Sequence, residues 1–78
     1  MIEQKTFGKM KFGTVFVNDD IRYVKVHEIY ALKESDWTVC CMFFPGEEFI
    51  TIGRVAMDDD RWVAYKDKVK RPRVSNVG

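Results

Sequence analysis

A β-dominated fold is predicted by three features of the sequence. β-Branched and aromatic residues cluster in short runs, and clusters of turn-forming residues separate these runs. The chain has only 78 residues, which is the size of one small domain. Because an open antiparallel meander leaves unpaired edges, we expect the five predicted strands to curl into a small β-barrel of the SH3-like or OB-like type.

The first two predicted strands form a hairpin. The run over residues 11–17 places aromatic and β-branched side chains on alternate faces, and a second run covers residues 21–31. The connection is Asn18, Asp19 and Asp20, and these residue types tolerate the left-handed backbone angles of tight hairpin turns. The second strand is long, so we expect it to bend.

The third predicted strand, residues 37–44, is apolar on both faces, and this pattern is typical of a strand covered on both sides. We therefore expect it at the centre of the sheet. Pro45 and Gly46 follow, and they predict a type II turn because proline presets the first central position and glycine accepts a positive φ at the second. The next strand, residues 48–57, contains Gly53, which predicts a bulge or bend.

The C-terminal part is predicted to add one more strand and an arm. Residues 58–60 are three aspartates that form a turn, and residues 61–65 form a last short strand. We place the barrel domain at residues 1–67 and a basic C-terminal arm at residues 68–78. The expected core consists of aromatic side chains: Phe12, Phe16, Trp37, Phe43 and Phe49, with Tyr23 or Trp62 at its margin.

Composition excludes several classes of protein. A hydrophobic fraction of 46% with only five Gly and two Pro is typical of a folded globular chain. The apolar run at residues 39–44 is far shorter than the roughly 20 residues of a membrane-spanning helix. The N-terminus lacks the pattern of a signal peptide, so we expect a cytoplasmic protein without membrane contact. Cys40 and Cys41 are adjacent and point to opposite faces, which predicts no disulfide and raised thiol pKa values.

Charge is distributed unevenly along the chain. The net charge is +2 over residues 1–18, −6 over residues 19–60 and +5 over residues 61–78. A basic arm of this kind neutralises phosphates or acidic protein surfaces, or it serves only as a solvated tail. The basic residues of this segment that we expect to contact a partner are Lys66, Lys68, Lys70, Arg71 and Arg73.

The chain has more aromatic residues than its core can accommodate. Exposed aromatic residues beside Arg and Lys serve both as hot spots in protein interfaces and as stacking platforms for bases. Their alternative role is to close the ends of the barrel as minor cores. We expect the partner-binding surface around Arg61, Trp62, Tyr65 and Lys66, with Tyr30 as a further exposed aromatic residue.

Acidic residues gather in the predicted turns. Asp is a preferred turn former and no EF-hand spacing is present, so we interpret these clusters as structural turns and expect no metal or other cofactor. Two of the clusters are expected at the same end of the meander, where they form an acidic face that meets a basic partner or mimics nucleic-acid phosphate. Its residues are Asp19, Asp20, Asp58, Asp59 and Asp60.

No catalytic constellation is recognisable. His27 is the only histidine, no motif places a nucleophile beside it, and its ordinary role is a partly buried, hydrogen-bonded side chain. Phosphate-binding glycine loops, CxxC pairs and GxSxG motifs are absent from the sequence. We therefore expect a protein that is not an enzyme.

A short stretch carries a resemblance to a known group of proteins. The sequence Lys9-Met10-Lys11-Phe12-Gly13 follows Phe7 and precedes Phe16, and a hairpin then ends in Tyr23-Val24-Lys25. This pattern over residues 7–25 resembles the opening of short proteins encoded by phages and prophages. The resemblance implies a source in a mobile genetic element and implies no activity.

These features predict a small non-enzymatic binding protein of phage or similar origin. It is expected to dock on a host protein and to modulate or inhibit it. One alternative is a nucleic-acid-binding barrel that uses the basic arm, with Trp62 and Tyr65 stacking on bases. Another is a homo-oligomeric structural or assembly component, in which the edge strand at residues 61–65 pairs across a two-fold axis.

Overall fold

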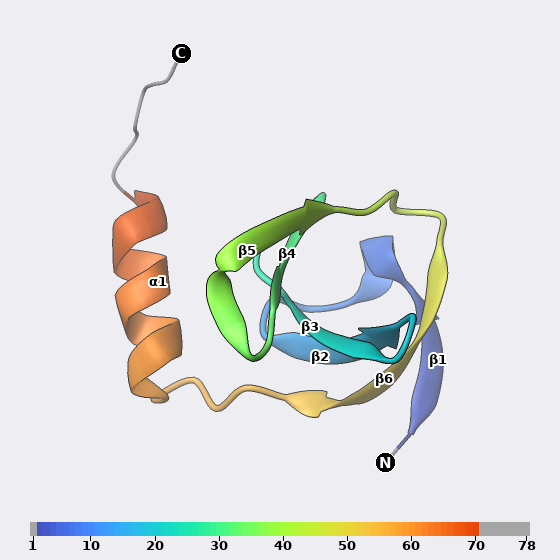
Figure 1. Ribbon diagram of the computed structural model, residues 1–78, viewed down its shortest axis with the longest axis horizontal. Coiled ribbons are helices and arrows are strands. Elements are labelled where there is room, and N and C mark those ends of the chain that lie inside the picture. Colours follow the sequence, from blue (N-terminus) through green and yellow to red (C-terminus); the bar gives the residue numbers. More distant parts are fainter. Residues whose placement is uncertain (1, 71–78) are drawn as a thin grey trace.

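The computed structural model describes the backbone of residues 2–70 and the side chains of residues 2–67 (Figure 1). This part of the chain forms six strands, a short 3-10 helix and one α-helix. In chain order they are β1 (Glu3–Thr6), the 3-10 helix η1 (Phe7–Lys9), β2 (Thr14–Asn18), β3 (Ile21–Lys25), β4 (Tyr30–Lys33), β5 (Asp36–Met42), β6 (Glu48–Arg54) and α1 (Asp60–Lys70).

All six strands belong to one antiparallel sheet. Their order is β1-β6-β2-β3-β4-β5, so β1 and β5 are its two edges. The sheet curls strongly, and α1 lies beside it next to β5 (Figure 1). The β-dominated fold class is confirmed, but the sheet has six strands and two edges where the sequence predicted a five-stranded barrel.

The first hairpin is confirmed in detail. Asn18 lies opposite Ile21 in the β2–β3 pair, so the loop has two residues. Asp19 and Asp20 have φ angles of 54° and 62°, which is the left-handed geometry of a type I′ hairpin turn. The predicted long strand over residues 21–31 is instead two strands, β3 and β4, because the expected bend is a complete chain reversal closed by bonds from the Val26 and His27 N–H groups to the Tyr30 carbonyl.

The predicted central strand exists as β5, but its position was predicted wrongly, since β5 is an edge. The apolar pattern on both faces has another cause. Trp37 packs against the residues around α1 on the outer face, and Cys41 packs against the aromatic core on the inner face. The other five residues of β5 are exposed, so the apolar pattern does not mark a strand that is covered on both faces.

The connection between β5 and β6 is a turn, as predicted, since the Glu47 N–H donates to the Phe44 carbonyl at 3.1 Å. It is not type II, because Gly46 does not adopt the positive φ that this type needs. The predicted bulge near Gly53 is confirmed. The pairing of β2 with β6 shifts there, so that Val15 faces Gly53 and the next residue of β2 faces Thr51.

Residues 61–65 form the first half of α1, so the strand predicted there is wrong. Asp59 caps the helix, because its Oδ1 accepts the Arg61 N–H at 2.9 Å and its carbonyl accepts the Val63 N–H at 2.9 Å. The i, i+3 spacing of Trp62 and Tyr65 then places both rings on one side of the helix. Because α1 continues to Lys70, the domain boundary expected after residue 67 falls inside it.

The curled sheet separates two apolar clusters. The inner cluster is Phe7, Met10, Phe16, Tyr23, Ala31 and Phe43, and the outer cluster is Val24, Val26, Leu32 and Trp62. The core positions predicted for Phe16 and Phe43 are confirmed, whereas Trp37 and Phe49 are half-buried. Phe12 was predicted wrongly and is 44% exposed, because Gly13 turns the chain with φ +92° before β2 begins.

Candidate functional site

The junction between α1 and the outer face of the sheet is built by three aromatic residues. Trp62 is only 2% exposed and packs among the valines and leucine of the outer cluster. Tyr65 stacks on Trp62 with ring centroids 6.3 Å apart. Trp37, from β5, meets both rings edge-on at 6.4 and 6.0 Å. We call Trp37, Trp62 and Tyr65 the aromatic cluster.

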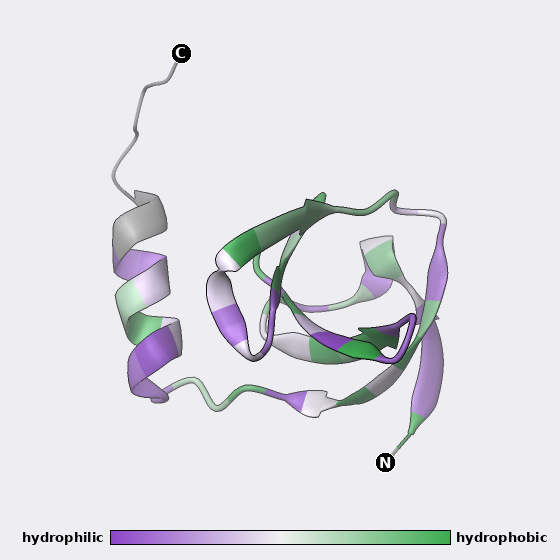
Figure 2. Cartoon of the chain, in the orientation of Figure 1, coloured by the Kyte–Doolittle hydropathy of each residue, from purple (hydrophilic) through white to green (hydrophobic). Residues whose placement is uncertain are grey.

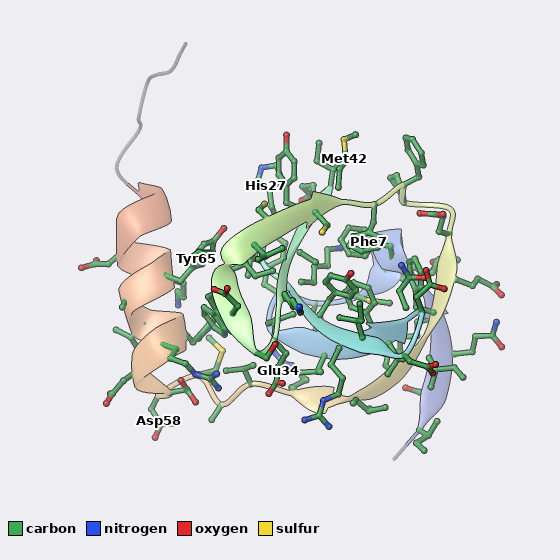
Figure 3. All side chains as sticks on the ribbon, viewed as in Figure 1. Phe7, His27, Glu34, Met42, Asp58 and Tyr65 are labelled. Atoms are coloured by element: carbon green, nitrogen blue, oxygen red, sulfur yellow. The ribbon has the colours of Figure 1, made fainter. Side chains whose placement is uncertain are left out.

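A pocket of about 240 Å³ opens beside this cluster. Its lining residues are Trp37, Thr38, Arg61, Ala64 and Tyr65. They come from β5 and from the first two turns of α1, which face each other across the pocket. Figure 3 shows Tyr65 in the space between the helix and β5. We call this hollow the aromatic pocket.

Two cations lie beside the aromatic pocket. The Arg61 guanidinium lies 5.1 Å from the centre of the Trp37 ring, and the Lys66 Nζ lies 5.9 Å from the centre of the Trp62 ring. Arg61 also contacts Asp59, with Nε 3.4 Å from Oδ1. These contacts lower the pKa of Asp59, chiefly through the hydrogen bond from the Arg61 side chain. The pocket therefore combines aromatic walls with an exposed, oriented guanidinium.

Two ionisable groups near the pocket, the Tyr65 phenol and the Cys40 thiol, stay neutral at neutral pH. Burial raises the pKa of the Tyr65 phenol, and the neighbouring Cys40 thiol raises it further. Burial also raises the pKa of Cys40, as the sequence predicted. The phenol is thus a hydrogen-bond donor, and Cys40 lacks the thiolate character of a catalytic nucleophile.

The indole groups of the aromatic cluster are unusual. The Nε1 atoms of Trp37 and Trp62 are both buried, and neither has an acceptor among the described residues. An unsatisfied buried donor costs about 1–3 kcal/mol. The helix is therefore held on the sheet by ring packing and apolar burial without help from these two donors.

Of the residues predicted to bind a partner, the structure brings Arg61, Trp62, Tyr65 and Lys66 together on α1. Trp62 is the exception in exposure, because it is fully packed in the outer cluster and presents no free face to a partner. The side chains of Lys68 and Lys70 lie outside the described residues, as do Arg71 and Arg73.

Tyr30 lies away from the aromatic pocket. It is 38% exposed, its ring centroid is 5.1 Å from that of His27, and it pairs across the ladder with Met42. His27 and Met42 lie together at the end of the sheet remote from the start of α1 (Figure 3). His27 is exposed rather than partly buried, and its Nδ1 accepts the Ile29 N–H at 3.3 Å, so only the expected hydrogen bond is confirmed.

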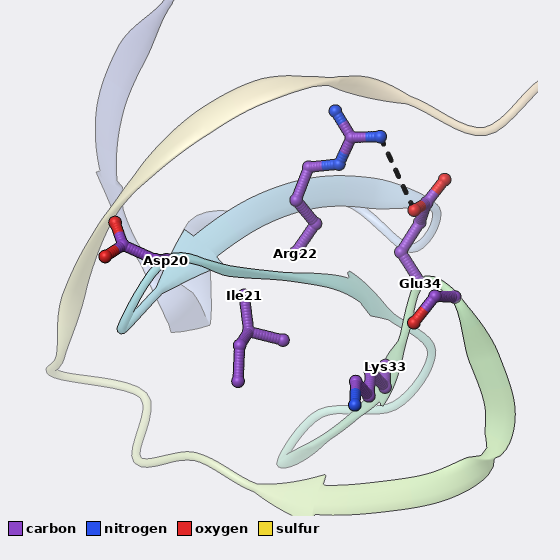
Figure 4. Close-up of a pocket in the computed structure, with 6 residues that line it drawn as sticks. Asp20, Ile21, Arg22, Lys33 and Glu34 are labelled. Carbon is purple, nitrogen blue, oxygen red and sulfur yellow. Dashed lines mark ion pairs between the residues drawn. The ribbon is translucent and has the colours of Figure 1, made fainter.

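The acidic residues do not form one face. Asp19 and Asp20 close the β2–β3 hairpin, whereas residues 58–60 lie at the start of α1 on the opposite side of the molecule (Figure 1). The Asp19–Asp20 turn adjoins a pocket of about 270 Å³ (Figure 4). In this pocket the Arg22 Nη2 lies 3.6 Å from the Glu34 Oε1, and Lys33 adds another cation. Within the described residues, no group of three or more His, Cys, Asp or Glu side chains is arranged to hold a metal ion.

Sequence reasoning missed the buried Lys25. This side chain is 1% exposed, and its Nζ donates to the carbonyls of Phe7 at 2.6 Å and Met10 at 3.0 Å. Burial lowers its pKa, and the charge of Glu28 partly opposes that effect. A sequence signal existed, because Lys25 has the same inward parity as Tyr23 on β3. Its role is to hold the N-terminal segment on the inner face.

A basic hollow was also missed. It has a volume of about 180 Å³ and lies where β1, β2 and β6 adjoin. Its cationic lining residues are Lys5, Lys11 and Arg54, and the Arg54 guanidinium donates to the Phe12 carbonyl at 3.3 Å. Glu3 also lines the hollow, and its Oε1 lies 3.5 Å from the Lys5 Nζ. Strand pairing creates this hollow from distant parts of the chain, so no local pattern reveals it.

Comparison with known proteins gave no relative for this chain. A scan against protein-family models, a search of curated proteins and a search of solved structures each returned no significant match. In the described part of the chain, α1 is too short and too polar to cross a membrane.

Proposed function

We propose that this protein is a non-enzymatic binding module that docks on a host protein and modulates or inhibits it. One observation carries the proposal, namely the aromatic pocket in which Trp37 and Tyr65 flank the exposed Arg61. Trp, Tyr and Arg are the residue types that contribute most to protein interfaces. The other predicted properties, a cytoplasmic location and an origin in a phage or mobile element, belong to the same proposal.

The chemistry of the pocket defines what a partner has to offer. An apolar or aromatic side chain of the partner fills the hollow between Trp37 and Tyr65, and a carboxylate pairs with Arg61 at its edge. The Arg61 side chain is held in place before binding, since its guanidinium already lies over the Trp37 ring and its Nε contacts Asp59. Such preorganisation lowers the entropy cost of association.

The barrel relationship is part of this proposal as well. Strands β2 to β5 form a meander, and β6 returns to pair with β2, which gives the order β6-β2-β3-β4-β5. We interpret this set of strands as an open relative of the SH3-like barrel, extended by β1 at one edge. Such folds serve many functions, so the pocket and not the fold carries the functional argument.

The experiment that tests the proposal is affinity capture from host-cell lysate with wild-type protein, R61E and K9E. Both substitutions reverse one exposed positive charge, but Lys9 lies on η1 and does not line the aromatic pocket. We expect a discrete, nuclease-resistant protein to be retained by wild type and K9E and lost with R61E. Equal retention by both variants would remove the aromatic pocket from the function.

Nucleic-acid binding is a second candidate, and the basic hollow favours it. Lys11 precedes the exposed Phe12 in the chain and Arg54 donates to the Phe12 carbonyl, and this combination suits a phosphate backbone with a stacked base. The base stacking expected from Trp62 has no free ring face to support it. This candidate predicts that K11A lowers the salt dependence of single-stranded DNA binding by about 0.7 in log–log slope.

A further inference from the structure

The two edges of the sheet differ sharply in chemistry. β1 carries Glu3, Gln4 and Lys5, which are the polar side chains that discourage another strand from pairing. β5 and the residues after it carry no charge from residue 37 to residue 46. Figure 2 shows this contrast, with β1 purple and the second half of β5 green. An uncharged edge of this length is open to pairing with another strand.

The register identifies which peptide groups of β5 are free. The Phe43 N–H donates to the Ile29 carbonyl at 2.8 Å, and Met42 lies opposite Tyr30. Hydrogen-bonded and non-hydrogen-bonded pairs alternate along an antiparallel ladder. Met42 and Cys40 therefore occupy non-hydrogen-bonded positions against β4, and their N–H and C=O groups point away from the sheet.

The neighbouring peptide groups along this edge are already engaged. The Phe44 N–H donates to Glu47 Oε1 at 3.2 Å, and the Phe44 carbonyl accepts the Glu47 N–H. The Thr38 N–H donates to Asp36 Oδ1 at 3.0 Å. The free section of the edge is thus centred on Cys41.

We propose that β5 pairs antiparallel with β5 of a second copy of this chain, about a two-fold axis at Cys41. In this register Cys40 of each copy exchanges two hydrogen bonds with Met42 of the other copy. The N–H and C=O groups of Cys40 and Met42 in the two copies thus form four hydrogen bonds in all. An axis at Cys40 would place Met42 opposite Thr38, whose N–H is already engaged. An axis at Met42 would place Cys40 opposite Phe44, whose N–H and C=O are both engaged. The two sheets then join into one continuous sheet.

A second copy suits this edge better than a strand of other chemistry. Two-fold pairing uses the same surface twice, and an uncharged strand meets itself without like-charge repulsion. Met42 is 58% exposed and Phe44 65% exposed, and Tyr30 lies beside Met42 on the same side. Pairing brings these apolar side chains from both copies together. α1 lies beside the start of β5 (Figure 1), and Met42 lies at the other end of this strand (Figure 3).

The first test is sedimentation equilibrium of the full chain with M42K and I50K. Both substitutions place a lysine at an exposed apolar strand position, but Ile50 lies on β6, which is paired on both sides. We expect twice the chain mass of 9.2 kDa for wild type and I50K. For M42K we expect a dimer dissociation constant at least about tenfold higher, because like charges at an interface disfavour association. A monomeric wild type, or equal dimerisation of all three proteins, would overturn the proposal.

The second test examines the register by oxidative cross-linking. Cys41 would face Cys41 of the second copy at a non-hydrogen-bonded position, where Cα atoms are about 4.5 Å apart and a disulfide can form. We expect C40S to form a cross-linked dimer with a mild oxidant and C41S to lose it. Cross-linking of C41S as efficient as that of C40S would overturn the two-fold axis at Cys41. Neither test changes a residue of the aromatic pocket, so the outcomes of both tests are independent of the proposed function.

Discussion

Replacing Trp62 by alanine tests how strongly α1 is held on the sheet. Trp62 is 2% exposed and packs on Val24, Val26 and Leu32. Truncation of a buried Trp to Ala typically costs about 3–5 kcal/mol. The substitution also removes the buried indole N–H that has no acceptor among the described residues, which returns about 1–3 kcal/mol. Taking the middle of each range, we therefore expect W62A to lower the free energy of unfolding by about 2 kcal/mol.

This loss is large for a chain of this size, whose total stability is about 4–12 kcal/mol. The assay is urea unfolding followed by the fluorescence of the remaining Trp37. W62F is the matched variant, because it keeps an apolar ring while it removes the unsatisfied donor together with part of the indole volume, and we expect it to lose less stability than W62A. A W62A protein as stable as wild type would refute the packing of α1 described here.

Three further predictions concern single residues. G13A should lower the free energy of unfolding by more than about 1 kcal/mol, measured by urea titration, because Gly13 has φ +92° in a buried turn. K25M should lower it by about 2 kcal/mol, since the Phe7 and Met10 carbonyls lose their donor. Because the folded-state pKa of Lys25 is lowered, wild type should gain stability relative to K25M as pH rises toward 10.5, and a constant difference would contradict this. The raised pKa of Cys40 stabilises the fold below pH 9.0 and this contribution is lost at higher pH, so thermal midpoints of C40A should fall less steeply than those of wild type above pH 9.0.

Local chemistry in the sequence was sufficient where the backbone alone decides the structure. The Asp19-Asp20 hairpin and the bulge near Gly53 were predicted because both depend on the conformational freedom of a few neighbouring residues. These features did not need knowledge of the tertiary fold.

Features that depend on tertiary neighbours were missed. Trp62 and Tyr65 suit a strand or a helix equally well over five residues, and the cap from Asp59 together with the outer face of the sheet selects the helix. The apolar run of β5 was assigned to the centre of the sheet, but the strand is an edge and most of its side chains are exposed, because an apolar run alone reports neither burial nor strand pairing. Lys25 was missed because its acceptors, the carbonyls of Phe7 and Met10, lie far from it in the sequence.

The candidate site was predicted in part. Arg61, Tyr65 and Lys66 were selected from the excess of aromatic and basic residues near the C-terminus, and they do lie together on α1. Trp37 was assigned to the core, and only the packing of α1 against β5 reveals it as a wall of the aromatic pocket. Tyr30 was included as an exposed aromatic residue and belongs to a different part of the surface.

Site-specific photo-cross-linking shows whether a partner protein occupies the aromatic pocket. A photoreactive amino acid at Ala64 lies in the aromatic pocket, and the same group at Ile50 lies on an exposed face of β6 outside it. In host-cell lysate, we expect the Ala64 probe to capture one discrete protein. Excess wild-type chain should compete for this protein, and excess R61E should not. Capture of the same proteins from both positions, or competition by R61E as effective as that by wild type, would contradict this expectation.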